Sequence, residues 1–503
     1  MTGRRGGGPP VATPIGRGVV RLGIVLLVSF AVLAAGAGYW QVVRSADLVG
    51  RPDDPLLIAA ARNVVRGVIR DRDGHVLATS KKDANGEPYR VYPSRSVAPV
   101  VGYASRLYGT AGLERAYDAE LTGIRPPDPI DELLAKFSAN RYRPQDLTLS
   151  LSLDLQREAV RLLGANRGSV VMLDPRSGEV LAMASTPTYD ASAIANPDTA
   201  KAAFASVSND PDKPFLDRAV QGRYVPGSVF KIVTSIAALG SGAITPATRY
   251  ARQPPAEKNG LLVSGYRVRD GHHPFTGSRQ LAYAEAVEVS CNIYFALTGL
   301  ETGGDALTSW AAKVGFGAPI PFDLPTVASQ VTNGGGSYGG GFSDDVELAN
   351  AAYGQGETLA TPLQMALVAA AVANRGTLMK PHLVTRLSGA DGATTIGPEV
   401  WRQVVSPDVA AEINAAMVRA VEGQEGRLFT AGAKVPGVLT AGKSGTAQLD
   451  GSAKPHSWFI GFAPANDPQI AIAVLVESGG SGTTRASPIA GRLMARYLAS
   501  VGK

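Results

Sequence analysis

A serine stands three residues before a lysine at the head of an apolar segment. Within GRYVPGSVFKIVTSIAALGSG (222–242), Ser228 and Lys231 have the i, i+3 spacing that puts two side chains on one face of a helix. Pro226-Gly227 predicts a helix start, where the helix dipole favours a developing anion. Apolar neighbours lower the pKa of a lysine by desolvation, so that a neutral amine can accept the serine proton. The pair is therefore a candidate nucleophile and base that need no histidine.

The Ser-x-x-Lys pattern is short, and Ser500–Lys503 matches it as well. Two further motifs follow the pair in the chain. Ser290-Cys291-Asn292 begins an apolar helical run, and Lys443-Ser444-Gly445-Thr446 lies in a predicted strand. Lys443-Ser444-Gly445 is the only Lys-Ser/Thr-Gly in the chain. The order of the three motifs indicates one catalytic site assembled from distant segments.

The elements that must position these motifs are predicted from alternation and helical spacing. Strands and a turn are expected over 168–185, after a strand and an amphipathic helix over 146–163. Three strands end the chain in GVLTAGKSGTAQL, HSWFIGFAP and QIAIAVLVES, before a helix over 487–500. Helical runs between them are expected over 281–300, 347–353 and 361–375. This pattern predicts one α/β domain whose sheet takes strands from both ends of the segment.

In the preceding part of the chain, residues 45–145, short apolar alternations are mixed with Gly, Pro and Asp turns. Residues 62–80 read as two strands joined at Asp73-Gly74, and 108–121 has helical spacing. We interpret this part as a smaller α+β module that holds the next domain away from a membrane.

The amino terminus predicts a membrane anchor. Residues 1–21 contain four arginines and no acidic residue, and Leu22–Val43 is a run of 22 residues without a charge, enough to cross a bilayer. The arginines place the amino terminus in the cytoplasm. A cleaved signal peptide ending near Ala35-Gly36-Ala37 is the competing interpretation, but the apolar run continues past that point. A single-pass cell-membrane protein with its catalytic domain outside the cytoplasm is expected.

Composition excludes several classes of function. The net charge is only +6, and basic residues are not clustered beyond the first residues, so no nucleic-acid partner is expected. Cys291 is the single cysteine, which excludes an intramolecular disulfide, and we interpret it as a packed side chain. The five histidines have no metal-ligand spacing along the chain, so we expect neither a metal nor another cofactor.

With its motifs in this order, the sequence resembles class B penicillin-binding proteins, most closely the compact actinobacterial kind associated with cell division and growth. The resemblance runs from about residue 20 to the end. The stretches that carry it are RGVIRDRDG (66–74), LDPRSGEVLAMASTPTYD (173–190), DRAVQGRYVPGSVFK (217–231), GQGETLATPLQMA (354–366) and HSWFIGFAP (456–464).

The resemblance implies the fold and domain order. We expect an α/β penicillin-binding transpeptidase domain over 146–503, with a mixed sheet flanked by helices as in the serine β-lactamases. A cytoplasmic tail (1–21), a transmembrane helix (22–43) and a pedestal or dimerisation-like domain (45–145) precede it.

The resemblance also implies the role of each motif residue in a peptidoglycan D,D-transpeptidase. Ser228 attacks the penultimate D-Ala carbonyl of a stem peptide, Lys231 is the base, and Ser290 relays a proton to the leaving amine. Asn292 binds a substrate amide oxygen and steadies Lys231. Lys443 supplies positive charge, Ser444 and Thr446 bind the terminal carboxylate, and Gly445 lets the substrate strand lie close. Backbone N–H groups of Ser228 and Thr446 form the oxyanion hole.

Other functions stay open at this point. A β-lactamase would share the motifs but needs a glutamate-held water, and Glu347-Leu348-Ala349-Asn350 lacks the Glu-x-x-Leu-Asn spacing. A D,D-carboxypeptidase differs only in using water as the acceptor. A non-enzymatic scaffold for a SEDS-type membrane glycosyltransferase is the alternative of another class. The implied partners are stem peptides, β-lactam antibiotics and such a glycosyltransferase.

Overall fold

The computed structural model describes residues 3, 14–39, 64–124, 143–449, 451 and 453–502, and every structural statement below concerns these residues. Contacts divide the chain into two units, residues 1–64 with 124–142, and residues 65–123 with 143–503. Helix α1 (Pro14–Gly38) belongs to the first unit. Its segment Gly18–Gly38 has a mean hydropathy of 2.4 and is long and apolar enough to cross a membrane. The helix thus begins before Leu22, where the anchor was predicted to start, and residues 40–43 of the prediction lie outside the described part of the chain. The bounds of the membrane-spanning part stay a prediction.

A five-stranded sheet forms the centre of the second unit. Its strands run in the order β15 (Ala441–Ala447), β16 (His456–Ala463), β17 (Ile470–Val476), β7 (Gly168–Leu173) and β8 (Val180–Thr186). All neighbours are antiparallel, and β17 pairs with β7 in the register Val474↔Val170. The prediction that the sheet takes strands from both ends of the segment is confirmed.

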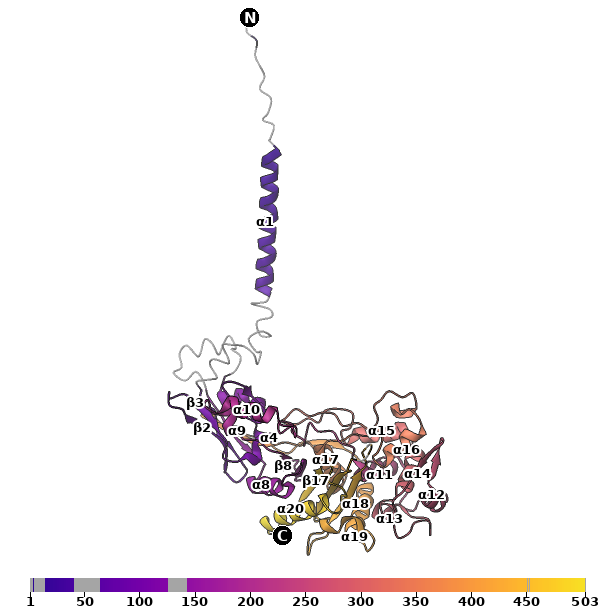
Figure 1. Cartoon of the computed structure of the whole chain (residues 1–503). Coiled ribbons are helices and arrows are strands. Elements are labelled where there is room, and N and C mark those ends of the chain that lie inside the picture. Colours follow the sequence, from indigo (N-terminus) through magenta and orange to yellow (C-terminus); the bar gives the residue numbers. More distant parts are fainter. Residues whose placement is uncertain are drawn as a thin grey trace. The chain divides into compact units, whose positions relative to one another are not determined.

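Helices cover both faces of this sheet. Helices α8 (Leu153–Leu163) and α20 (Ala486–Ser500) pack on one face, and the yellow α20 can be followed along it in Figure 1. On the other face lie α17 (Pro362–Ala373) and α18 (Pro407–Glu422). Because both faces of the sheet are covered, every residue of β7, β8 and β17 is buried, and their sequences are apolar without alternation.

Most of the helices between residues 227 and 352 form the part of the unit that carries the first two motifs. They are the 3₁₀ helix η3 (Gly227–Phe230), α11 (Lys231–Ser241), α12 (Gln253–Asn259), α13 (Tyr283–Glu288), α14 (Asn292–Thr302), α15 (Gly304–Lys313) and α16 (Asp345–Ala352). A small hairpin of β9 (Leu261–Val263) and β10 (Tyr266–Val268) lies among them.

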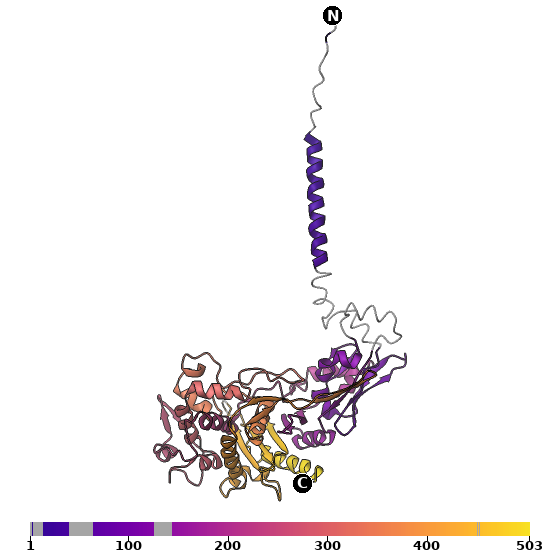
Figure 2. The same cartoon turned by 180° about the vertical axis from the view of Figure 1, so that it is seen from behind.

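A second sheet of six strands joins segments that are far apart in the sequence. Its order is β13 (Gly392–Thr395), β12 (Val384–Gly389), β6 (Asp146–Leu149), β1 (Ile69–Arg70), β2 (Val76–Lys82) and β3 (Pro88–Val91). The predicted hairpin at Asp73-Gly74 is present as the antiparallel pair β1–β2. Figure 2 shows the orange ribbon that contains β12 reaching into the purple strands. The strands on either side of residue 145 therefore share one sheet, and the domain boundary there stays a prediction.

The other elements are short or lie at the surface. They are η2 (Arg95–Val97), α4 (Ala98–Val101), β4 (Ala104–Ser105), β5 (Gly109–Thr110), α5 (Gly112–Ala116), α6 (Asp118–Thr122), α9 (Ala191–Ala195), α10 (Ala200–Ser208), η4 (Gly339–Gly341), β11 (Thr377–Met379), β14 (Val400–Gln403), α19 (Arg427–Thr430) and η5 (Ala431–Ala433). The predicted helix over 108–121 is thus two short helices that meet at Tyr117.

Candidate active site

Ser228 lies in the 3₁₀ turn that precedes α11. The neighbouring Val229 and Phe230 are fully buried, whereas Ser228 is only partly buried. Gly227 has a φ of 57°, and a Cβ there would come within 3.1 Å of the Thr446 carbonyl oxygen. Glycine therefore allows this turn to lie directly against β15. We call Gly227–Phe230 the nucleophile turn after the role predicted for Ser228.

The backbone before Ser228 is held by three other parts of the fold. Tyr224 exchanges two backbone hydrogen bonds with Ala360, and the Trp458 indole N–H donates to the Val225 carbonyl at 3.0 Å. The Tyr224 hydroxyl donates to Glu477 at 2.8 Å. These contacts fix the position of the nucleophile turn. No sequence motif marks Trp458 or Glu477, so their contacts with this turn could not be predicted.

Lys231 and Lys443 meet at one serine hydroxyl. The Lys231 amine donates to the Ser290 carbonyl at 2.5 Å, to Asn292 Oδ1 at 2.8 Å and to Ser290 Oγ at 3.2 Å. The Lys443 amine lies 2.9 Å from the same Ser290 Oγ and 3.0 Å from the Ser444 carbonyl oxygen. The structure thus joins residues from all three motifs through one network beside the nucleophile turn.

Burial changes the acid–base behaviour of both lysines. Desolvation lowers the pKa of Lys231 to about 8, although Asp270 and Cys291 favour its charged form. Desolvation and the charge of Lys231 together hold the pKa of Lys443 well below its usual value. Two ammonium groups sharing one hydroxyl in a dry site repel each other, so a neutral amine is accessible near neutral pH.

Among the hydrogen bonds of the described residues, none joins the Ser228 hydroxyl to the Lys231 amine. The amine is engaged by Ser290 and Asn292 instead. Catalytic hydrogen bonds are often formed only when substrate is bound, so the role of Lys231 as the base stays a prediction.

The second motif lies in a break between two helices. The sequence predicted one helical run over 281–300, but α13 ends at Glu288 and α14 begins at Asn292. Ser290 between them has a φ of 59°, a left-handed conformation that costs free energy in a residue other than glycine. This conformation presents both the carbonyl and the hydroxyl of Ser290 to Lys231, which periodicity alone does not predict.

The third motif lies on an end strand of the five-stranded sheet. β15 is the edge strand of this sheet: it pairs with β16 on one side and with no described strand on the other. Lys443 is fully buried, Ser444 is nearly so, and Thr446 is exposed, with its hydroxyl accepting from the Gly482 N–H at 3.2 Å. An edge strand of this kind can accept an extended peptide as an additional strand.

Gly445 has a structural reason that the sequence interpretation did not give. A Cβ at this position would lie 2.9 Å from the Pro226 carbonyl oxygen and 3.1 Å from Val229 Cγ1. The missing side chain therefore faces the nucleophile turn and allows it to pack on β15. The predicted contact of Gly445 with a substrate strand stays a prediction.

A cluster of buried side chains lies behind the second motif. The members are Glu257, Asp270, His273 and Cys291, whose potential ligand atoms all lie within 4.8 Å of one another. The Asp270 carboxylate accepts from the Asn292 backbone N–H at 3.0 Å, so the cluster directly contacts the turn formed by Ser290, Cys291 and Asn292. Its members come from separate segments, which is why spacing along the chain predicted no metal site.

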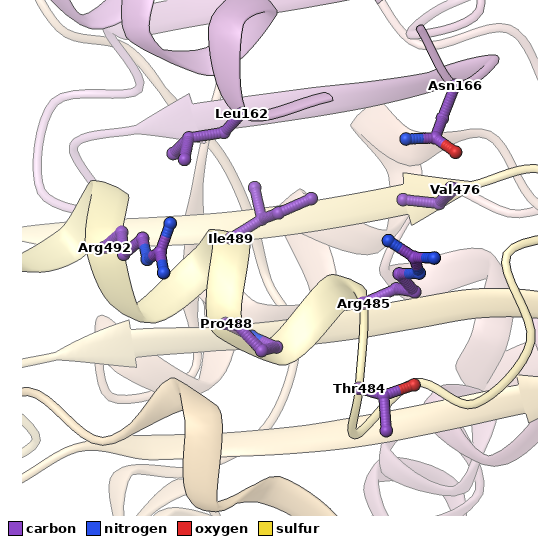
Figure 3. Close-up of a pocket in the computed structure, with 8 residues that line it drawn as sticks. All are labelled: Leu162, Asn166, Val476, Thr484, Arg485, Pro488, Ile489 and Arg492. Carbon is purple, nitrogen blue, oxygen red and sulfur yellow. The ribbon is translucent and has the colours of Figure 1, made fainter. Parts of the chain in front are cut away.

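A surface hollow lies at the start of α20, apart from these motifs. Its lining residues are Leu162, Asn166, Val476, Thr484, Arg485, Pro488, Ile489 and Arg492 (Figure 3). None of them belongs to the three motifs, so this hollow does not mark the chemistry.

The motif geometry agrees with comparisons to known proteins. The family model for the penicillin-binding protein transpeptidase domain matches residues 168–495, and that for the penicillin-binding protein A dimerisation domain matches residues 66–144. The chain belongs to the penicillin-binding protein transpeptidase family. The resemblance to class B penicillin-binding proteins and the predicted fold class are both confirmed.

Curated relatives and solved structures cover nearly the whole chain. The peptidoglycan D,D-transpeptidase PbpA of Mycolicibacterium smegmatis is 36% identical, over 95% of this chain and 98% of that protein. The PbpA of Mycobacterium tuberculosis is 33% identical, over 91% of this chain and 93% of that protein. A ceftriaxone acyl-enzyme complex of M. tuberculosis penicillin-binding protein A superposes with a TM-score of 0.76 at 31% identity, covering 87% of this chain and 99% of that one.

Proposed function

We propose that this chain is a peptidoglycan D,D-transpeptidase that works through a serine acyl-enzyme at Ser228. The observation that carries the proposal is the Lys231–Ser290–Lys443 network beside a nucleophile turn that packs on β15. The names of the relatives and the acyl-enzyme structures of penicillin-binding protein A support the same chemistry.

The acylation step needs a proton acceptor and a proton donor. Neutral Lys231 accepts the Ser228 proton as Ser228 Oγ attacks the carbonyl carbon of the penultimate D-Ala. The tetrahedral intermediate collapses with cleavage of the C–N bond, and Ser290 passes a proton to the departing D-Ala amine. Because Ser290 contacts both lysines, it can recover that proton from the network.

The donor peptide is held along β15. Ser444 and Thr446 bind its terminal carboxylate, Lys443 supplies positive charge, and Asn292 binds an amide oxygen. The N–H groups of Ser228 and Thr446 stabilise the oxyanion. The amine of a second stem peptide then attacks the ester carbonyl, forming the cross-link and releasing Ser228.

The apolar helix at the amino terminus fits a membrane anchor. We further propose the finer arrangement that the sequence predicts, with a cytoplasmic tail over 1–21, an anchor over 22–43, a pedestal over 45–145 and the transpeptidase domain over 146–503, outside the cytoplasm. A SEDS-type glycosyltransferase is the proposed membrane partner.

The hydrolytic alternatives differ only in what resolves the acyl-enzyme. Glu347, the acidic residue considered for a β-lactamase, accepts hydrogen bonds from the Thr332 hydroxyl at 2.5 Å and the Ser343 N–H at 2.8 Å. Its carboxylate is thus engaged in its own turn, which favours the transpeptidase.

A product assay separates the candidates. The full-length chain in detergent is given a stem pentapeptide ending in D-Ala-D-Ala and a labelled amine acceptor, beside Ser228→Ala. We expect D-Ala release together with a cross-linked product, both lost in Ser228→Ala. Release of D-Ala with only the shortened peptide as the second product would indicate a carboxypeptidase. If penicillin is added in place of the peptide, its rapid hydrolysis would indicate a β-lactamase. A folded protein with no release at all would leave the scaffold function.

A further inference from the structure

His456 is the first residue of β16 and lies beside the third motif without belonging to it. It pairs with Ala447, the residue that follows Thr446 at the end of β15. Its ring packs perpendicular to that of Tyr224, with the ring centroids 5.4 Å apart. His456 therefore contacts the segment that leads into the nucleophile turn and also the end of the strand proposed to bind substrate.

The imidazole of His456 acts as a hydrogen-bond acceptor. Its Nδ1 accepts from the Ser478 backbone N–H at 3.1 Å. Burial lowers the pKa of His456, so at neutral pH the ring is uncharged and keeps the lone pair that this bond needs. Ser478 has a φ of 48°, a left-handed conformation that costs free energy in a residue other than glycine. The histidine thus holds a strained residue in the segment that follows β17.

That segment, residues 478–482, leads back to β15. In its middle, the Ser457 hydroxyl of β16 donates to the Ser481 carbonyl at 3.0 Å. At its end, the Gly482 N–H donates to the Thr446 hydroxyl at 3.2 Å. The segment is therefore held on β16 by His456 and by Ser457, and it contacts the third motif through its last residue.

The bond from Gly482 determines what the Thr446 hydroxyl can offer to a ligand. A hydroxyl has one proton to donate and lone pairs that accept. Because the Gly482 N–H takes an acceptor position, the Thr446 proton must point elsewhere, and among the described residues no group accepts it. Thr446 is exposed, so this proton is available to a bound ligand. An ionised carboxylate, which only accepts hydrogen bonds, is the matching group.

We propose that His456 is a positioning residue for recognition of the terminal carboxylate of the substrate. By holding Ser478 it fixes the 478–482 segment, which keeps the Gly482 N–H on the Thr446 hydroxyl. That hydroxyl is then held as a donor to the carboxylate. The inference rests on the function proposed above, in which Thr446 binds this carboxylate.

Two substitutions at His456 separate its hydrogen bond from its ring packing. His456→Phe keeps a ring against Tyr224 but removes the acceptor of the Ser478 N–H. His456→Asn removes the ring but offers an amide oxygen close to the position of Nδ1. His75→Phe is the matched control, because it makes the same change at a histidine whose side chain is 61% exposed.

Acylation is measured on the full-length chain in detergent with benzylpenicillin and with its methyl ester, which lacks the negative carboxylate. We expect the wild type to react faster with the free acid. His456→Phe should lower the rate with the acid roughly fivefold, as for one lost hydrogen bond, and leave the rate with the ester nearly unchanged. His456→Asn should restore most of the rate with the acid, and His75→Phe should behave as the wild type.

The ester distinguishes carboxylate recognition from general support of the fold. Equal losses with the acid and the ester in His456→Phe would indicate only such support and would overturn the proposal. An unchanged rate with the acid in this variant would also overturn it. So would a wild type that reacts equally with both compounds, or a His456→Asn protein that reacts no faster with the acid than His456→Phe.

Amide hydrogen exchange, resolved to single residues, tests the same path without depending on acylation. In His456→Phe both the Ser478 and the Gly482 amides should exchange faster than in the wild type, and His456→Asn should slow both again. Faster exchange at Ser478 alone would overturn the proposal, because the effect would not reach Thr446. A wild type that neither compound acylates would contradict the proposed function, whereas the exchange rates would still decide whether His456 holds the segment.

Discussion

The two sides of the Ser290–Asn292 turn carry opposite charges. On one side, Lys231 and Lys443 share the Ser290 hydroxyl in a buried cationic site. On the other, Glu257 and Asp270 lie in an equally buried acidic site with His273 and Cys291. Three consecutive residues separate the two, and Asn292 touches both, through its side chain to Lys231 and its N–H to Asp270.

The two opposite sides explain how the fold keeps Lys231 buried with a lowered pKa. Asp270 and Cys291 on the acidic side favour the charged form of Lys231, but desolvation is the larger effect and lowers its pKa. In the proposed function the cationic side provides the reactive groups, whereas Asp270 on the acidic side holds the turn that those groups contact by accepting from the Asn292 N–H.

The largest expected effect comes from removing the amine of the cationic side. Lys231→Ala should lower the rate of acylation by penicillin about 10²–10⁴-fold, the range typical for loss of a general base. The measurement is stopped-flow acylation of the full-length protein. Lys434→Ala is the control, since that half-exposed lysine pairs with Glu422. A loss of less than tenfold would remove Lys231 from the role of base.

A second prediction displaces the nucleophile and leaves both charged sites intact. In Gly445→Ala the new Cβ approaches the Pro226 carbonyl at 2.9 Å, so the turn that carries Ser228 must shift. Acylation should fall roughly 10²-fold, as expected for a displacement of about 1 Å in an active site. Gly397→Ala, where a Cβ meets nothing within 4 Å, should have no effect. Equal rates for the two variants would contradict the packing argument.

The pH dependence tests the cationic side in the unmodified protein. Because the pKa of Lys231 is lowered to about 8, its neutral form increases as pH rises and predominates above that value. The acylation rate should therefore rise about tenfold per pH unit below the pKa and level off above it. A rate that is flat or falls between pH 6 and about 8 would contradict a lysine base.

The last prediction concerns Asn292, the residue that contacts both sides of the turn. Asn292→Asp places a carboxylate where Oδ1 now lies 2.8 Å from the Lys231 amine. An opposite charge at this distance favours the ammonium form, so the rise in the pH profile should move upward by about 1–3 pH units. Asn292→Ala is the control, because it removes the same side-chain amide without adding a negative charge. An unmoved profile in Asn292→Asp would show that another group controls the rate.

Much of the frame could be predicted from sequence because it depends on local patterns. Unbroken apolar runs and the Asp73-Gly74 turn indicated strands that the structure contains, and the order of the motifs indicated residues that it joins. The break at Ser290 could not be predicted, because a tertiary contact with Lys231 overrides the helical periodicity of 281–300. The acidic side was missed because Glu257 lies on helix α12 and Asp270 and His273 lie in the loop after β10, and only tertiary packing brings them together.

The identity of the nucleophile can be tested by mapping the residue that penicillin acylates. The full-length protein is incubated with penicillin, digested, and analysed by mass spectrometry for the modified peptide. We expect a long-lived acyl group on Ser228 alone, in the peptide that contains VPGSVF, and no adduct in Ser228→Ala. An adduct on another residue, or one that persists in Ser228→Ala, would contradict this expectation.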